Sequence, residues 1–257
     1  MTTADLLLVA LSALAVLVGT VLQRVTGSGV GAVGGPPLIL LLGPVAGVQV
    51  LHVVAAVCSV MLLVNLWRDV DWTRTTVLTL TAIIATPIGV LLAFTLPEPV
   101  LQIAVGLVML AALFTVEPLA RTRLMRSRLG IVATGVLGGV ANGTVGQAGP
   151  LMAAYAVASR WALPGFVASM QVCWLVVNVV AAVMKGVPPV APEVGAVLLG
   201  ALAAGWAVSI PVARALPRRT ATRILVVVAV AGSAVLLAKG LWALVAALVL
   251  AGQPGMT

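Results

Sequence analysis

The stretch Arg24-Val-Thr-Gly-Ser-Gly-Val-Gly-Ala-Val-Gly-Gly-Pro-Pro37 lies within an apolar run that extends from Leu6 to Leu42. This run is almost twice as long as the roughly 20 residues that a helix needs to cross a bilayer. Glycine and proline disfavour continuous helix, by about 1 and 3 kcal/mol per residue respectively. Such backbone survives at membrane depth only where it is buried in protein or lines a polar cavity. The region therefore predicts a hairpin of two helices that meet at a glycine-rich break.

A second break of the same kind lies between Leu129 and Ser159. Its middle reads Gly135-Val-Leu-Gly-Gly-Val-Ala-Asn-Gly-Thr-Val-Gly-Gln-Ala-Gly-Pro150. Two dipeptides recur in the same order, Gly35-Pro36 as Gly149-Pro150 and Leu96-Pro97 as Leu216-Pro217. The sequence therefore predicts an internal repeat in which each copy opens with a broken-helix hairpin.

The composition excludes a water-soluble enzyme and a soluble nucleic-acid-binding domain. Of the 257 residues, 62% are hydrophobic and only 8% are charged, which is too little polar surface to cover a soluble globule of this size. The net charge of +8 comes from basic residues in short breaks between apolar runs, as in the cytoplasmic loops of membrane proteins. We therefore interpret the chain as an integral membrane protein.

Six further apolar runs predict membrane-spanning helices, three in each half of the chain. They are Val48–Trp67, Thr75–Leu96, Val100–Val116, Leu163–Met184, Val194–Ala213 and Ile224–Leu237. A last apolar piece, Leu241–Leu250, is too short to span alone, so it either lengthens the preceding helix or lies at the membrane interface. The predicted fold is an all-α polytopic membrane protein.

Charge and span count together predict how the two copies are oriented. We place the first repeat at residues 1–119, a basic linker at 120–128 and the second repeat at 129–257. The linker carries four arginines and is expected to be cytoplasmic, with the protein multi-pass in the plasma membrane. Three net crossings per half invert the second copy, which is the inverted-repeat design of secondary transporters. Their substrate sites lie where broken helices meet near the midplane.

The two glycine-rich segments also carry a family resemblance. The motifs Gly27-Ser-Gly-Val-Gly-Ala-Val-Gly-Gly-Pro36 and Gly143-Thr-Val-Gly-Gln-Ala-Gly-Pro150, together with the two-half organisation, resemble the TauE/SafE sulfite exporter family, also called toluene-sulfonate uptake permeases. The resemblance covers nearly the whole chain. It implies a carrier of small sulfur-containing or other organic anions, and both import and export are assigned within the family.

Broken helices suit an anion substrate because they present unpaired N–H groups and the positive end of the helix dipole. Glycine lets such backbone approach an oxyanion closely. The predicted substrate-binding residues are Thr26, Gly27, Ser28, Gly29, Gly34, Gly35, Asn142, Gly143, Thr144, Gly146, Gln147, Gly149, Gln171 and Asn178. The alternative is that the glycines only allow close helix packing, and that polar side chains such as Gln171 and Asn178 only join helices.

The positions of the ionisable residues limit which side chains could couple proton movement to transport. All six acidic residues lie at or near predicted span ends, which disfavours a carboxylate proton relay. His52, the only histidine, either couples proton movement to anion movement or is a neutral side chain bonded to a neighbouring helix. Arg24 either attracts the anion near the first break or extends to the membrane interface.

We expect a secondary transporter that works by rocking one half against the other, without a metal, nucleotide or redox cofactor. Its expected partners are a small anionic substrate and the lipid bilayer, with no nucleic acid, and a homodimer stays open. The alternatives are a passive anion channel, a carrier of non-sulfur carboxylates and a non-transporting scaffold. An intramembrane hydrolase using Ser28 and His52 has no support beyond the presence of both residues, so no enzyme activity is expected.

Overall fold

The computed structural model describes residues 3–188 and 190–251, and over these residues it is a bundle of helices without strands. Within this part of the chain, six helices are long and apolar enough to cross a membrane. They are α1, α3, α4, α8, α9 and α10, whose bounds are given below. The prediction of an all-α polytopic membrane protein is thereby confirmed.

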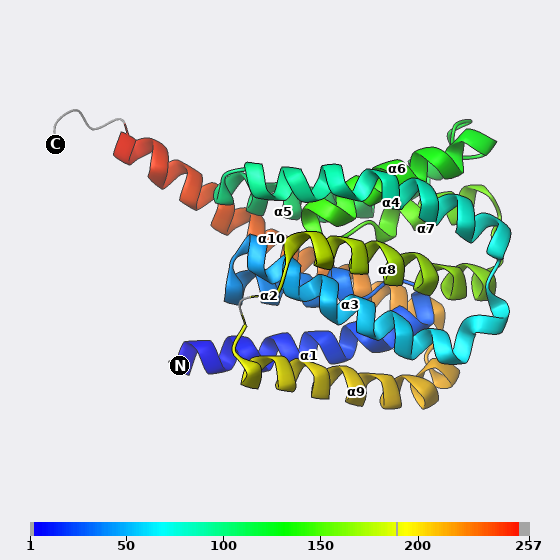
Figure 1. Ribbon diagram of the computed structural model, residues 1–257, viewed down its shortest axis with the longest axis horizontal. Helices are drawn as coiled ribbons and strands as arrows, with labels where there is room; N and C mark the ends of the chain where they lie inside the picture. Colours follow the sequence, from blue (N-terminus) through cyan, green and yellow to red (C-terminus); the bar gives the residue numbers. More distant parts are fainter. Residues whose placement is uncertain (1–2, 189, 252–257) are drawn as a thin grey trace.

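The order of elements recurs in the two halves of the chain (Figure 1). The first half contains α1 (Thr3–Thr26), the π-helical turn η1 (Val30–Gly34), α2 (Gly35–Leu42), α3 (Pro44–Leu66), the 3-10 turn η2 (Trp67–Asp69), α4 (Trp72–Thr95) and α5 (Glu98–Ala120). The second half contains α6 (Arg128–Val145), α7 (Gly149–Ala158), α8 (Leu163–Lys185), α9 (Pro192–Ala215) and α10 (Arg218–Ala251). In each half a long helix, a break and a short helix precede three long helices.

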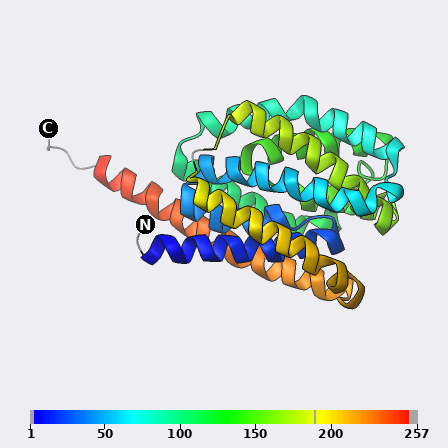
Figure 2. The same ribbon diagram turned by 60° about the horizontal axis from the view of Figure 1, so that its bottom comes forward.

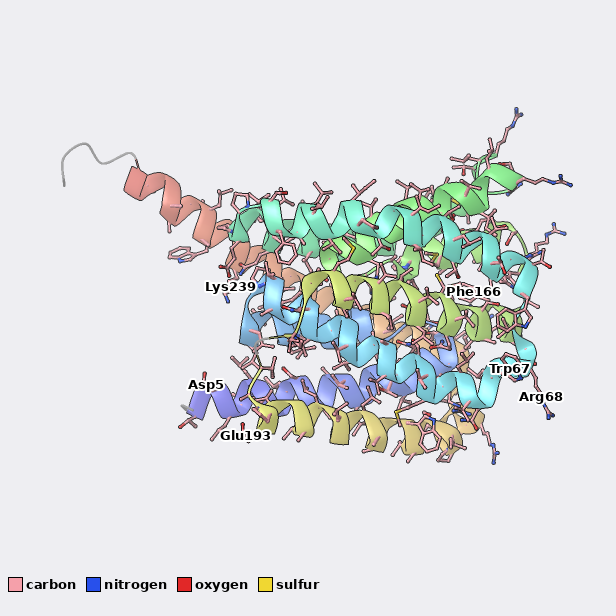
Figure 3. The ribbon with its side chains drawn as sticks, in the orientation of Figure 1. Asp5, Trp67, Arg68, Phe166, Glu193 and Lys239 are labelled. Carbon is pink, nitrogen blue, oxygen red and sulfur yellow. The ribbon has the colours of Figure 1, made fainter. Side chains whose placement is uncertain are left out.

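Equivalent helices of the two halves run in opposite directions. Figure 3 places Trp67, at the end of α3, and Phe166, near the start of α8, at the same end of the bundle. Asp5 and Glu193, near the starts of α1 and α9, lie together at the opposite end. Helices α1 and α9 therefore run in the same direction, whereas their equivalents in the other half, α6 and α4, begin at the end that carries Trp67. This arrangement is the one that an inverted repeat requires, and the inverted repeat stays our interpretation of it.

The end of the bundle that carries Arg68 is called the basic end below. Because α3 and α5 finish there and α4 and α6 begin there, it also carries the 120–128 linker. The junctions before α8 and before α10 lie at the same end and add Arg160 and the stretch Arg214–Arg223.

Two close helix pairs, α1 with α9 and α4 with α6, each combine one helix from the first half with one from the second half. Figures 1 and 2 both show α1 and α9 side by side. In the second pair, a Cβ atom on Gly139 would fall on the carbonyl oxygen of Ala82, and one on Gly89 would fall on that of Val140. Small residues of this kind let membrane helices approach backbone to backbone. The alternative packing role of the glycines therefore holds for these positions.

The two largest clusters of the apolar core also mix the halves. One cluster joins side chains of α4, α6, α7 and α8, and the other joins side chains of α1, α2, α3 and α9. The two clusters are equivalent under the exchange of the halves. The break after α1 contributes Val30 to one cluster, and the break after α6 contributes Ala148 to the other.

The final helix decides between the two alternatives that the sequence leaves open for Leu241–Leu250. Helix α10 continues without interruption from Arg218 to Ala251, so Leu241–Leu250 lengthens the preceding helix rather than forming a separate element. Figures 1 and 2 show its last turns extending beyond the bundle, at the end that also carries the start of α1.

Candidate functional site

Helices α1 and α6 end in the same way, at a glycine with left-handed backbone. Gly27 follows α1 with φ 82°, and Gly146 follows α6 with φ 72°. Residues with a Cβ atom rarely adopt this conformation, so the sequence can turn here only with glycine. The N–H groups of both glycines still bond back to their helices, from Gly27 to the Gln23 carbonyl at 2.9 Å and from Gly146 to the Asn142 carbonyl at 2.8 Å.

The two breaks touch each other inside the bundle. A Cβ atom on Gly149 would fall on the Ser28 hydroxyl oxygen. A Cβ atom on Gly31 would lie 2.8 Å from Oε1 of Gln147 and 3.0 Å from the carbonyl oxygen of Gly146. The glycines therefore let segments that are more than 100 residues apart in sequence meet at one place.

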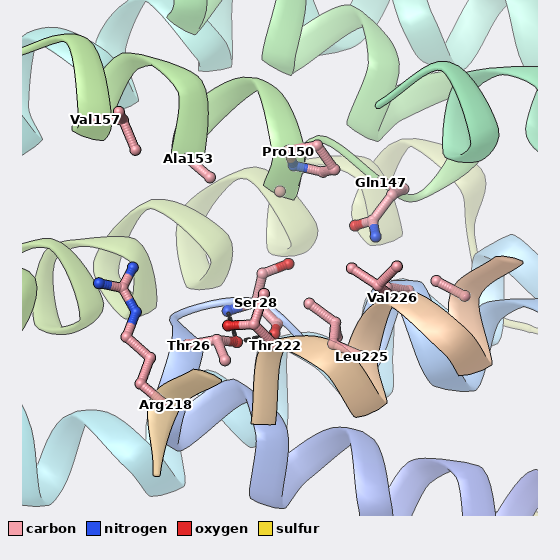
Figure 4. A pocket seen from close by; sticks show the side chains of 13 residues that line it. Thr26, Ser28, Gln147, Pro150, Ala153, Val157, Arg218, Thr222, Leu225 and Val226 are labelled. Carbon is pink, nitrogen blue, oxygen red and sulfur yellow. Dashed lines mark hydrogen bonds between the residues drawn. The ribbon is translucent and has the colours of Figure 1, made fainter. Parts of the chain in front are cut away.

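A cavity of about 330 Å³ opens at this contact (Figure 4). Its polar lining comes from both breaks and from the start of α10, and its apolar lining from α7, α10 and η1. The residues around it are Thr26, Ser28, Ala32, Gln147, Gly149, Pro150, Ala153, Val157, Arg218, Thr222, Leu225, Val226 and Ala229. Since Arg218 is the first residue of α10, the cavity extends from the two breaks toward the basic end.

Most of the polar side chains in the cavity are free to bind a ligand. The Ser28 hydroxyl and the Gln147 amide have no hydrogen-bond partner among the described residues. The Thr26 hydroxyl is engaged with the carbonyl oxygens of Leu22, at 2.9 Å, and Ser28, at 2.5 Å. No acidic residue lines the cavity. Helix α7 begins at Gly149 in its wall, which directs the positive end of that helix dipole toward the space.

A smaller pocket of about 20 Å³ adjoins the cavity, and Ser28 and Gln147 line both. Its other lining residues are Gln23, Gly31, Ala55, Asn142, Gly146, Trp174 and Asn178. This volume holds about one water molecule. The polar surface of the site therefore extends from the cavity, through Ser28 and Gln147, into this smaller pocket.

Side chains of α8 hold the first break in place. Nε2 of Gln23 donates to Oε1 of Gln171 at 3.0 Å, and Oε1 of Gln23 accepts from the N–H of Val30 at 3.1 Å. Nε1 of Trp174 donates to the carbonyl oxygen of Gly27 at 3.0 Å. Gln171 is fully buried and lines neither pocket, so its place in the structure is that of a support for Gln23.

Helices α3 and α8 hold the second break. Nδ2 of Asn142 donates to Oδ1 of Asn178 at 3.1 Å, and Nε2 of His52 donates to the carbonyl oxygen of Asn142 at 3.0 Å. The His52 ring is fully buried, and its Nδ1 atom has no partner among the described residues. His52 thus lies behind Asn142 rather than in the cavity wall.

Seven of the predicted site residues line at least one of the two pockets: Thr26, Ser28, Asn142, Gly146, Gln147, Gly149 and Asn178. The others lie close by in the protein. A Cβ atom on Gly29 would fall on the backbone of α1, and one on Gly143 on the backbone of α4. The Thr144 hydroxyl donates to the Val140 carbonyl oxygen at 2.8 Å. Gly27, Gly34 and Gly35 shape the first break, while Arg24 lines neither pocket.

Four polar or aromatic lining residues are absent from the sequence prediction: Gln23, Trp174, Arg218 and Thr222. All four belong to regular helices and reach the site only through tertiary packing. The sequence holds one hint, because Gln23 is a polar residue one turn before the break at Gly27. Among the described residues, no group of three or more His, Cys, Asp or Glu side chains lies together as a candidate metal site.

Comparison with known families finds a match over most of the chain. The family model described as "Sulfite exporter TauE/SafE" matches residues 11–237. The matched region contains both breaks and every residue that lines the two pockets. Comparisons with curated proteins and with solved structures find no significant match.

Proposed function

Because the chain belongs to the TauE/SafE sulfite exporter family, and is thus a multi-pass membrane transporter, we propose that it moves a small sulfur oxyanion or organosulfonate through the cavity between the two breaks. The observation that carries this proposal is the meeting of the breaks around unpaired neutral donors. Ser28 and Gln147 offer a hydroxyl and an amide, and no carboxylate opposes an anion there.

Neutral donors suit a carrier because it must release what it binds. A buried ion pair is costly to separate, whereas N–H and hydroxyl donors bind an oxyanion without a full opposite charge. The start of α7 at Gly149 adds the positive end of a helix dipole. We therefore propose Ser28, Gln147 and the Gly149 backbone as the central contacts to the oxyanion.

We propose that this site is exposed to each side of the plasma membrane in turn, with the 120–128 linker on the cytoplasmic side. The cavity extends toward the basic end, which the positive-inside rule places in the cytoplasm. Close pairs such as α1 with α9 combine helices of both repeats. The bodies that move against each other would then each contain helices from residues 1–119 and 129–257.

The proposal is tested by flux in liposomes. Purified protein should carry sulfite into vesicles with saturation, and preloaded unlabelled sulfite should accelerate entry of labelled sulfite by counterflow. Sulfonates such as taurine should compete, and acetate should compete less. Saturable acetate transport without sulfite transport would contradict the sulfur assignment, and non-saturable flux without counterflow would indicate a passive channel.

We propose His52 as the residue that couples a proton to anion movement. It is the only histidine in the sequence, and its Nε2 bonds to Asn142, a residue that lines the smaller pocket. Its Nδ1 atom has no partner among the described residues. In His52→Gln, the amide can still donate to the Asn142 carbonyl, but no titratable ring remains. We expect this variant to keep counterflow and to lose the dependence of net sulfite flux on a pH gradient.

Ser59→Ala is the matched control for this variant. Ser59 is also fully buried on α3, and its hydroxyl likewise lacks a partner among the described residues, but it does not titrate near neutral pH. Its response to the gradient should equal that of the unmodified protein. A full gradient response in His52→Gln would show that coupling does not pass through this ring.

A further inference from the structure

Helix α10 forms one wall of the cavity with a single helical face. Arg218, Thr222, Leu225, Val226 and Ala229 recur at the spacing of one face of an α-helix, and all line the cavity. Figure 4 shows the Arg218 side chain extending from α10 across the space toward Val157 of α7. A helix without a glycine-rich break thus supplies the positive charge of the site.

The Arg218 guanidinium has no counter-charge. Two arginines at the basic end have acidic partners, Arg74 with Asp71 and Arg121 with Glu117. Arg218 has no ion pair or hydrogen bond with any of the described residues, and no carboxylate lines its cavity. The Thr222 hydroxyl, one turn further along α10, is also unpaired within the described chain. An oxyanion in the cavity would satisfy both groups.

A second basic group continues the route toward the surface. A neighbouring cavity of about 290 Å³ shares Thr26, Val157 and Arg218 with the first and adds Arg160. Arg160 also lines a surface pocket with Arg121, Arg126 and Glu117, and Glu117 offsets one of these charges through its pair with Arg121. Arginines therefore follow one another from the basic end to the two breaks, which is the arrangement that attracts and guides an anion.

We propose that Arg218, together with Thr222, is the anion-selecting group of the site and binds the oxyanion as it enters from the basic end. This inference rests on the proposed function and deepens it. The planar guanidinium pairs with two oxygens of a sulfite or sulfonate group, and the Thr222 hydroxyl donates to one of them. Ser28 and Gln147 then receive the anion at the breaks.

Thiol labelling tests the local field without requiring transport. The rate of each reagent with a Thr222→Cys variant is first divided by its rate with a small free thiol in solution. On this scale the anionic reagent 2-sulfonatoethyl methanethiosulfonate should react faster than its trimethylammonium analogue, and the labelling ratio is the first normalised rate divided by the second. Adding Arg218→Gln should lower this ratio by about 5- to 10-fold, because one nearby charge acts oppositely on the two reagents. The native cysteines, Cys58 and Cys173, are fully buried, so the parent protein gives the background.

Arg219→Gln is the matched control, because it removes the same charge from the same turn of α10. Arg218 and Arg219 are both exposed, but Arg219 lines neither of the two cavities that Arg218 lines. In the Thr222→Cys background this control should change the labelling ratio by less than about twofold, since its charge lies outside the cavity that Thr222 lines and is screened by salt. Equal ratios in the Arg218→Gln and Arg219→Gln variants would overturn the inference.

Sulfite flux provides the second readout. Arg218→Gln should raise the KM for sulfite added at the basic end about 5- to 10-fold, Arg218→Lys should raise it less, and Arg219→Gln should leave it unchanged. If the unmodified protein transports sulfite and Arg218→Gln has an unchanged KM, the inference fails while the proposed function stands. If no sulfur anion is transported, the proposed function fails, and with it the assignment of the oxyanion to Arg218.

Discussion

A Gly149→Ala variant is expected to lose sulfite flux by about 10- to 100-fold while remaining folded. The added methyl group would fall on the Ser28 hydroxyl oxygen and lie 2.9 Å from the Ser28 Cβ atom, at the contact between the two breaks. Overpacking at such a contact costs about 1–3 kcal/mol. Here the neighbour is a short side chain at the edge of the cavity, so we expect the site to be distorted rather than the bundle. Initial rates in proteoliposomes measure the loss, and size-exclusion chromatography checks folding.

Two further variants separate the cause of this loss. Gly200→Ala places a methyl group where no atom lies within 4 Å, so its flux should equal that of the unmodified protein. Adding Ser28→Gly to Gly149→Ala removes the atoms that the methyl group meets and should restore flux to the level of Ser28→Gly alone. A double variant as inactive as Gly149→Ala would show that the contact with Ser28 is not the reason.

A Gly139→Ala variant is expected to have the largest effect on stability. Its methyl group would fall on the Ala82 carbonyl oxygen, and because this neighbour is backbone of α4 it cannot rotate away. Helices α4 and α6 would have to separate, which affects the cluster of α4, α6, α7 and α8 side chains as well. We expect a cost of about 3 kcal/mol, at the upper end for overpacking. The measurement is the thermal melting temperature in detergent, together with the yield of monodisperse protein.

The control for this variant should not lower the melting temperature. Gly200→Ala also replaces glycine by alanine in the middle of a long helix, but with open space around the new atom. Alanine is the better helix former by about 1 kcal/mol, so the melting temperature should stay the same or rise. A Gly139→Ala protein that melts no lower than Gly200→Ala would contradict the close contact between α4 and α6.

The sequence predicts the spans and the two breaks because both are local properties. Apolar length and glycine density need no knowledge of neighbours, and the predicted spans fall within α3, α4, α5, α8, α9 and α10 with small shifts at their ends. The π-helical form of the turn Val30–Gly34 was not predictable in this way. For Leu241–Leu250 the sequence left two alternatives open, and α10 continues past Lys239 because a helix tolerates a single polar residue there.

The site is predictable only where the chain itself is irregular. Ser28 and Gly149 belong to the breaks, and the sequence identifies them for that reason. Arg218 and Trp174 belong to regular helices, so only the packing of α10 and α8 brings them to the same place. The sequence cannot tell a glycine that packs helices together from a glycine that shapes the site, because this too depends on tertiary packing. Gly143 and Gly149 are alike in sequence, but one faces the backbone of α4 and the other faces the Ser28 side chain.

The pairing of α1 with α9 has a consequence for how the protein is made. Helix α1 ends at residue 26 and α9 begins at residue 192, so their contact closes only when most of the chain has left the ribosome. At about 5–20 residues per second, the first helix waits roughly 10–30 s in the bilayer for its neighbour. During this delay, Gly205 has not yet reached the backbone of Leu17. Insertion and folding are therefore separate events in time, and a chain that stops at the linker leaves α1 and α4 each without the helix it packs against.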